Sequence, residues 1–274
     1  PYRAEMNDVI SRKLDEEKNG YKKRILFTFI QQHQTVAFAK KELNMLIDRF
    51  SMFASRLGSR AKQVDKKEML TILSEILLTK SEKEEPELED ILPDVIELKQ
   101  HKNYLKMDDH YAKTIYLQEY PAELSDTFLY ELLEIPRELV VTLHINPPDQ
   151  DEAFDLVKTK LAFMEQQKVD EQKKALQNGY DFEMLSYDLT YSLTEAKELV
   201  DDLQNKGQKL FSMTGSIHFN ADTVEKLAEI QGEISSIGRQ FGFKIIELEF
   251  LQEEGLNTAL PLGGNSLPLD RTLS

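Results

Sequence analysis

The chain has 274 residues, of which 41% are hydrophobic and 30% are charged, so it is large enough to bury a core in one or two domains. It contains no cysteine, which excludes disulfides, thiolate metal sites and a cysteine nucleophile. Its net charge of −15 argues against a dedicated nucleic-acid binder, because phosphate backbones are held mainly by Lys and Arg.

Residues 1–80 are expected to form an N-terminal subdomain of a strand and helices. The run from Ile25 to Ile30 is short, apolar and aromatic, which is typical of a buried strand. Apolar residues recur at helical spacing from Thr35 to Leu57, where Gly58 ends the helix, and again from Lys66 to Thr79. This third carries a net +6 and the remainder −21, so it is a candidate for peripheral contact with an anionic membrane or with an acidic partner; a solvated helical surface is the alternative.

An acidic connection, residues 81–110, is expected to follow, because its first ten residues are too charged to bury and contain Pro86. Residues 111–250 then alternate between strands and helices, with an insertion at 149–207. Without the insertion the order is strand, helix, strand, strand, helix, strand. That order predicts an α+β fold with a ferredoxin-like antiparallel sheet and both helices on one face. The expected strands are 111–118, 138–146, 209–219 and 243–248, and the expected helices are 122–134 and 222–240.

The insertion is expected to be a helical pair that begins at Asp149. Its second helix is predicted to begin at the capping box from Ser192 to Glu195, where two side chains satisfy unpaired backbone amides. Apolar residues between the two helices either pack back on the sheet or cover a partner. If the pair projects, it becomes a docking arm. The candidate docking residues are Phe182, Met184, Leu185, Tyr187 and Tyr191.

The alternation of side chains along a strand assigns two faces to the sheet. One face is apolar and is expected to contact the two helices, and the other is polar and is expected to be open or covered again. An RNA-recognition module has the same topology, but its open face carries aromatic residues and basic neighbours, which this polar face lacks. The apolar set is Leu139, Val141, Leu143, Ile145, Phe211, Met213, Ile217 and Phe219; the polar set is Thr142, His144, Asn146, Ser212, Thr214, Ser216 and His218.

The C-terminal region resembles a known protein family. Its Ala-Leu-Pro-Leu-Gly block with an Arg beyond it is similar to the join between the N-terminal and ATPase domains of the large motor ATPases of type IV secretion and conjugative DNA transfer, the VirB-four family. Further matches are Tyr116 to Pro121, His144 to Asp149 and Gly207 to Phe211, so the resemblance covers roughly residues 111–274. We call the following residues the join motif: Thr258, Ala259, Leu260, Pro261, Leu262, Gly263 and Arg271.

The resemblance implies a cytoplasmic, oligomeric parent protein at the inner face of the cell membrane, whose P-loop ATPase domain binds ATP and magnesium. It implies that this part contacts inner-membrane and channel components of a secretion machine, with possible self-association. Residues 251–274 are then a linker toward an absent ATPase domain. No Gly is followed by Lys here, so no P-loop is present and no cofactor is expected in this part. A free-standing adaptor or scaffold of the same fold is the alternative.

No residue of the chain is predicted to be catalytic, cofactor-binding or metal-binding. His101 and His110 flank a loop with Asp108 and Asp109, but a zinc site needs three or four convergent ligands, so exposed loop residues are the default interpretation. His144 and His218 are expected on neighbouring strands, where they could face one another as a neutral pair. We therefore expect this part to have no enzymatic activity.

Overall fold

The computed structural model describes residues 23–79, 83, 86–98, 100–121, 123–177, 187–267 and 271–273. The chain divides into two compact units, which are treated separately below. The first unit comprises Pro1–Leu143 with Gly215–Pro268, and the second comprises His144–Thr214 with Leu269–Ser274.

Local sequence signals account for where most helices begin and end. The side chains of Thr35, Ser125 and Thr223 accept hydrogen bonds from backbone amides in the first turn of α2, α4 and α7, as helix N-caps do. Gly58 and Gly242 follow α2 and α7 with φ of +75° and +76°, a conformation that glycine adopts without strain. The helices are α2 Val36–Arg56, α3 Lys66–Ile76, the 3-10 helix η1 Leu88–Ile91, α4 Asp126–Glu134, α5 Gln150–Gln177, α6 Tyr187–Asn205, α7 Val224–Gln240 and α8 Gln252–Ala259.

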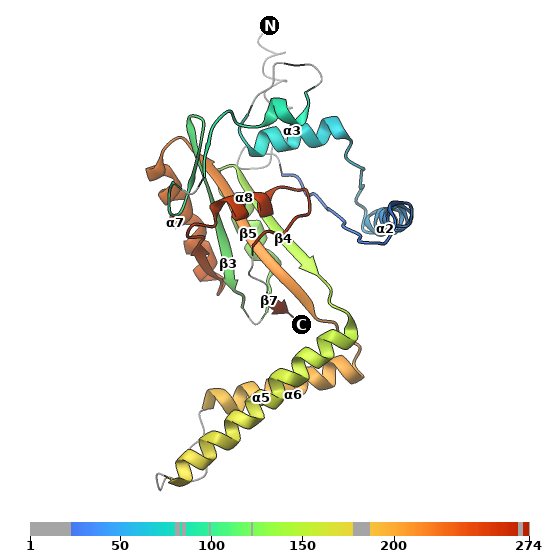
Figure 1. Ribbon diagram of the computed structural model, residues 1–274, viewed down its shortest axis with the longest axis vertical. Coiled ribbons are helices and arrows are strands. Elements are labelled where there is room, and N and C mark those ends of the chain that lie inside the picture. Colours follow the sequence, from blue (N-terminus) through green and yellow to red (C-terminus); the bar gives the residue numbers. More distant parts are fainter. Residues whose placement is uncertain are drawn as a thin grey trace. The chain divides into compact units, whose positions relative to one another are not determined.

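The sheet is antiparallel and confirms the predicted ferredoxin-like topology (Figure 1). Its path runs β1-β2-β3-β5-β4, with β6 paired to β3 and β7 paired to β5. The four strands of the ferredoxin-like motif therefore lie in the order β6-β3-β5-β4, and the insertion connects the edge strand β4 to its neighbour β5. The strands are β1 Ile96–Glu97, β2 Leu105–Met107, β3 His110–Glu119, β4 Leu139–Asn146, β5 Phe211–Ala221, β6 Lys244–Glu247 and β7 Arg271–Leu273.

The main core lies between the sheet and helices α4 and α7, as the apolar face predicted. Ile115 of β3 pairs with Ile217 of β5, and both are fully buried. Leu139 and Val141 pack against the same core, but Leu143, Ile145 and Phe211 are 38%, 58% and 39% exposed. The prediction is wrong for these three residues, because the core covers neither the second half of β4 nor the start of β5. The core consists of Ile115, Leu117, Phe128, Leu132, Ile135, Ile217, Phe219, Leu227, Ile230, Ile234 and Phe243.

Much of the polar face of the sheet is covered again. Helix α8 packs on β3 (Figure 1), where its Leu256 lies in one buried cluster with Ala112. Thr214, Ser216 and His218 of β5 are also buried, whereas Asn146 of β4 is exposed. The segment expected as a linker, residues 251–274, thus contains a helix that forms part of the first unit.

Three sequence predictions outside the sheet motif are wrong. Ile25 to Ile30 forms no strand within the described part of the chain, and Ile25 and Ile30 are 80% and 67% exposed. Residues 81–110 contain η1, β1 and β2, so part of the expected connection belongs to the sheet. Helix α6 begins at Tyr187, which places the supposed capping box at Ser192 inside the helix, where the Ser side chain has no helix end to cap.

Helix α8 approaches β3 closely at Gly255. A methyl group there would lie 2.7 Å from Leu248 Cδ1 and 2.8 Å from Thr114 Cβ, and the latter atom is held by the sheet. We expect Gly255→Ala to lower the free energy of unfolding by about 1–3 kcal/mol, although alanine favours helix. Gly232→Ala in α7, where nothing lies within 4 Å, should instead raise it by about 0.5–1 kcal/mol. Urea titrations of both variants would contradict this account if their effects had the same sign.

Candidate interaction site

Six of the seven residues of the join motif, from Thr258 to Gly263, are built into the first unit at the end of α8. Thr258 and Ala259 are buried, and Thr258 Oγ1 accepts a hydrogen bond from the Ser266 amide at 3.0 Å. Two distant hydroxyls hold the motif from outside: Thr142 of β4 donates to the Ala259 carbonyl at 3.2 Å, and Thr28 donates to the Pro261 carbonyl at 3.0 Å. The motif therefore fixes α8 to its surroundings.

The remaining residues of the join motif have different surroundings. Leu260 packs against two buried clusters, and Leu262 is 58% exposed. Gly263 has φ of +82°, which favours glycine, and a Cβ there would lie 2.6 Å from Ile30 Cδ1, so the Ile30 side chain would have to move. Arg271 lies in β7 and pairs with Met213 of β5; its side chain is outside the described atoms.

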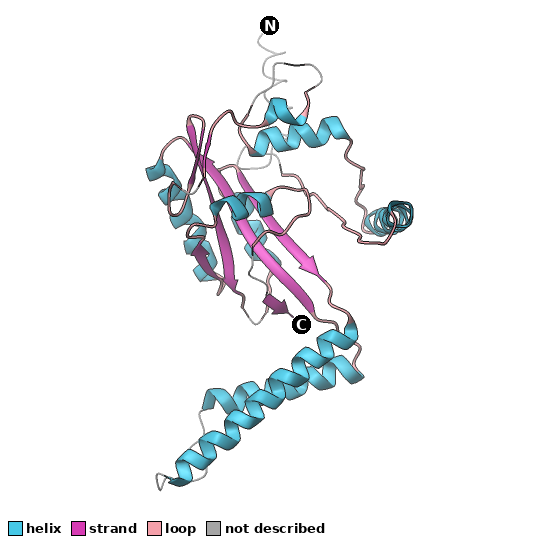
Figure 2. Cartoon of the chain, in the orientation of Figure 1, coloured by secondary structure: helices cyan, strands magenta, loops and turns pink. Residues whose placement is uncertain are grey.

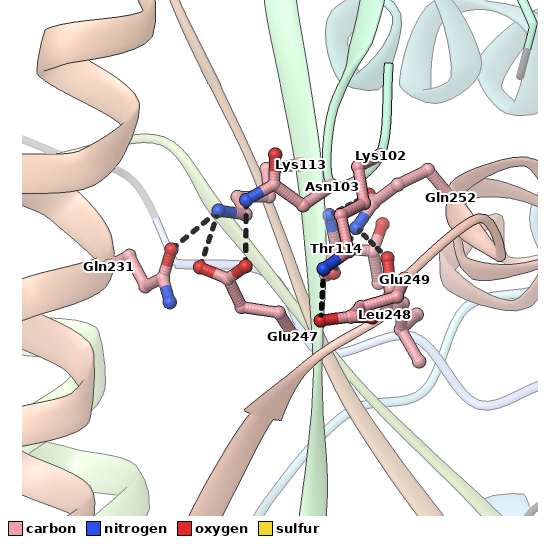
Figure 3. Close-up of polar contacts among 9 residues, drawn as sticks. All are labelled: Lys102, Asn103, Lys113, Thr114, Gln231, Glu247, Leu248, Glu249 and Gln252. Atoms are coloured by element: carbon pink, nitrogen blue, oxygen red, sulfur yellow. Dashed lines mark hydrogen bonds and ion pairs between the residues drawn. The ribbon is translucent and has the colours of Figure 1, made fainter. Parts of the chain in front are cut away.

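Gln252, at the start of α8, closes a gap in the sheet (Figure 3). On one side of β3, pairing with β2 ends at Ala112 and pairing with β6 begins at Ile115. Thr114 lies in between, and its amide donates to Gln252 Oε1 at 2.8 Å while its carbonyl accepts from Gln252 Nε2 at 3.0 Å. The side-chain amide thus replaces a strand neighbour for a buried backbone.

A charged network lies beside this gap, and Figure 3 shows it on the other side of β3. Lys113 Nζ donates to Gln231 Oε1 at 2.6 Å and to Glu247 Oε1 at 2.9 Å, and Asn103 donates to Glu247 Oε2 at 2.7 Å. Burial by itself raises the pKa of Glu247, but the hydrogen bonds from Asn103, Lys113 and Gln231 outweigh it and hold that pKa below its usual value. A general acid needs the opposite shift, so this arrangement does not suit Glu247 to that role.

The histidines do not assemble a metal centre in the described part of the chain, where no group of three or more metal-binding side chains occurs. His101 contacts Glu97 at 3.1 Å and stacks on Tyr104. His218 is buried and its Nδ1 lies 3.0 Å from Thr114 Oγ1. Burial, and then the charge of buried His110, lower the pKa of His218 to about 4, so His218 is neutral at pH 7.

The second unit contains the predicted helical pair, which Figure 2 shows as α5 and α6 side by side. Ala153 and Val157 of α5 pack with Leu203 of α6, and Glu165 pairs with Lys197 at 3.1 Å. Of the predicted docking residues, Tyr191 is 57% exposed, and Tyr187 begins α6. The predicted residues Phe182, Met184 and Leu185 lie outside the described residues.

Sequence reasoning missed the residues that build this region most directly. Gln252, Lys113 and Glu247 are isolated polar residues in segments of ordinary composition, and their partners are more than a hundred residues away in the chain. No motif or periodicity encodes such pairings. A comparison with models of protein families and a comparison with curated proteins found no match to this chain.

Proposed function

We propose that this chain is the N-terminal docking and assembly domain of a type IV secretion motor ATPase, and that it is not catalytic in itself. The observation that carries the proposal is the way the join motif is held, by hydroxyls from Thr142 and Thr28 and by the close approach of Ile30 to Gly263. A motif fixed to a sheet in this way gives the parent protein's ATPase domain a firm attachment.

The docking arm in this proposal is the helical pair α5–α6. In one part of the pair, Ala153 and Val157 of α5 pack with Leu203 of α6, which fixes the two helices against each other. Elsewhere it exposes large side chains: Phe163 is 72% exposed and Tyr191 is 57% exposed. Exposed aromatic residues are common anchors of protein interfaces. The partners that fit are inner-membrane and channel components of the machine, at the cytoplasmic face of the membrane.

Among the described helices, none is long and apolar enough to cross a bilayer. In this proposal ATP and magnesium belong to the parent protein's ATPase domain. The chain itself would position the ATPase domain and take part in assembly of the machine. A free-standing adaptor remains the second candidate, and the experiment below separates the two.

A photo-crosslinking amino acid at Tyr191 tests the docking arm in cells that assemble a working transfer machine. We expect crosslinks from Tyr191 to membrane components of that machine. A matched probe at Tyr130 of α4, which is 52% exposed in the other unit, should not give them. We further expect Tyr191→Ser in the parent protein to lower transfer frequency about tenfold, since truncating an aromatic anchor often costs more than 1 kcal/mol of binding.

Three outcomes would count against the proposal. Equal crosslinking from Tyr191 and Tyr130 would mean that the arm is not a specific contact. Crosslinks from Tyr191 to soluble proteins alone, unchanged in cells without the machine, would favour the adaptor. Unchanged transfer by Tyr191→Ser, with normal protein abundance, would remove this residue from the docking surface.

A further inference from the structure

Residues 23–60 combine positive charge with exposed apolar surface. They contain seven Lys or Arg and two Asp or Glu, a net charge of +5, while the rest of the chain carries −20. Within the same stretch Ile25, Phe27 and Ile30 are 80%, 61% and 67% exposed. Single exposed apolar residues are normal on a protein surface, but a cluster of them marks a contact surface.

Helix α2 continues this surface. Only Ala54 among its 21 residues is buried. One side of the helix rests on the preceding segment, where the Phe50 ring lies 4.5 Å from Phe27 and 5.3 Å from Phe29. The exposed apolar residues of α2 and its C-cap are Val36, Phe38, Met45, Leu46, Met52, Phe53 and Leu57.

These exposed residues are ordered along the helix. Phe38, Met45 and Met52 recur every seven residues, and so do Leu46 and Phe53, which gives two adjacent rows about 100° apart. Arg49 and Arg56 follow the same seven-residue spacing and lie between the rows. Long cationic side chains in this position can lay their stems on apolar surface and extend their charges toward a polar layer.

The two acidic residues of the stretch lie at different places relative to this face. Glu42 accepts a hydrogen bond from Gln31 Nε2 at 2.7 Å and is half-buried. Asp48 is exposed and lies about 140° around the helix from Phe53, but about 60° from Met45 and about 40° from Met52, so it borders the methionine row. Arg49 and Arg56 lie between the two rows and give the centre of the face its positive charge.

We propose that α2 and residues 23–30 form a lipid-facing surface that lies on an anionic bilayer. Amphipathic helices bind in this way when apolar side chains enter the headgroup boundary while Lys and Arg meet anionic lipid. A second copy of the same surface fits less well, because pairing would bring two segments of net charge +5 together. The proposal extends the location proposed above, but it does not depend on the docking arm.

Co-sedimentation of the full 274-residue chain with vesicles tests this surface. We expect binding to phosphatidylcholine vesicles that contain phosphatidylglycerol, and little binding to pure phosphatidylcholine. Added salt should weaken the binding, because it screens exposed charges. Absence of binding to the anionic vesicles at low salt would overturn the proposal, even if the crosslinks from Tyr191 to the machine were found.

Paired variants locate the surface. The double substitution Arg49→Glu with Arg56→Glu reverses both charges. It should lower the partition coefficient of the chain on anionic vesicles about tenfold or more, since each basic residue near an anionic surface contributes roughly 1 kcal/mol of binding free energy. The matched control is Lys160→Glu with Lys174→Glu, two exposed positions of α5, and it should bind as the parent chain does.

A second pair tests the apolar contribution. Phe38→Ser with Phe53→Ser should lower binding at least as much, whereas Phe163→Ser on α5, at a 72% exposed phenylalanine, should not. Circular dichroism would confirm that each variant is folded. If the phenylalanine pair instead converted a dimer to a monomer in sedimentation velocity and left vesicle binding unchanged, the surface would be a contact between copies and the lipid proposal would be wrong.

Discussion

Gln252→Leu is expected to lower the free energy of unfolding of the first unit by about 3 kcal/mol. The substitution keeps the size of the side chain but removes both hydrogen bonds to the backbone of Thr114, which is 1% exposed. Each buried polar group without a partner costs about 1–3 kcal/mol, because water cannot replace the lost bond. Gln252 Nε2 also donates to the Leu248 carbonyl at 3.0 Å, so a third buried group loses its partner.

Urea unfolding measures the total loss, and hydrogen exchange of the Thr114 amide reports it locally. The matched control is Gln240→Leu at the exposed end of α7, which should change stability by less than about 0.5 kcal/mol. If Gln252→Leu unfolded at the same urea concentration as the parent chain, with unchanged protection of Thr114, the side-chain amide would not be completing the sheet.

The sheet motif was predictable because its signals are local. Proline and glycine mark its turns, since Pro147 follows β4 and Gly242 adopts a positive φ before β6. The helix caps Thr35 and Thr223 likewise act within one turn of their own position. Alternation along β5 then assigned Ile217 to the core without any knowledge of the partner strand.

The N-terminal segment shows where local signals fail. Ile25 to Ile30 has the composition of a strand, but a strand also needs a neighbour with free backbone groups, and no property of the segment itself provides one. The segment is held instead by side chains: Lys23 pairs with Glu134 at 2.8 Å, and Thr28 donates to the Pro261 carbonyl. Its apolar residues remain exposed, which is the basis of the lipid-facing surface proposed above.

Short strands and isolated polar residues escaped prediction for a related reason. β1 and β2 have two and three residues, too few to establish an alternating pattern. The roles of Gln252 and Lys113 depend on partners 138 and 134 positions away in the chain. The join motif was found through resemblance to a family; its hydrogen bonds to Thr142 and Thr28 could not be read from the sequence, because they depend on the tertiary fold.

Lowering the pH from 6.5 to 4 is expected to lower the free energy of unfolding of the first unit by about 3 kcal/mol, because of His218. The folded-state pKa of His218 is lowered from 6.5 to about 4, mainly by burial and secondarily by His110. Between these two values the unfolded chain binds a proton at this site and the folded chain does not, so lower pH favours unfolding. The contribution of neutral His218 is therefore complete above about pH 6.5 and is lost as the pH falls to about 4.

His218→Gln tests this directly, because glutamine does not titrate. The variant should be less stable at pH 7, where the contact of His218 with Thr114 Oγ1 is lost, but its stability should change much less between pH 6.5 and pH 5. That interval lies above the range in which most carboxylates are protonated, so it isolates the histidine effect. His33→Gln, at an exposed histidine, is the matched control and should keep the slope of the parent chain. Equal slopes in His218→Gln and the parent chain would show that burial of this imidazole does not govern the acid response.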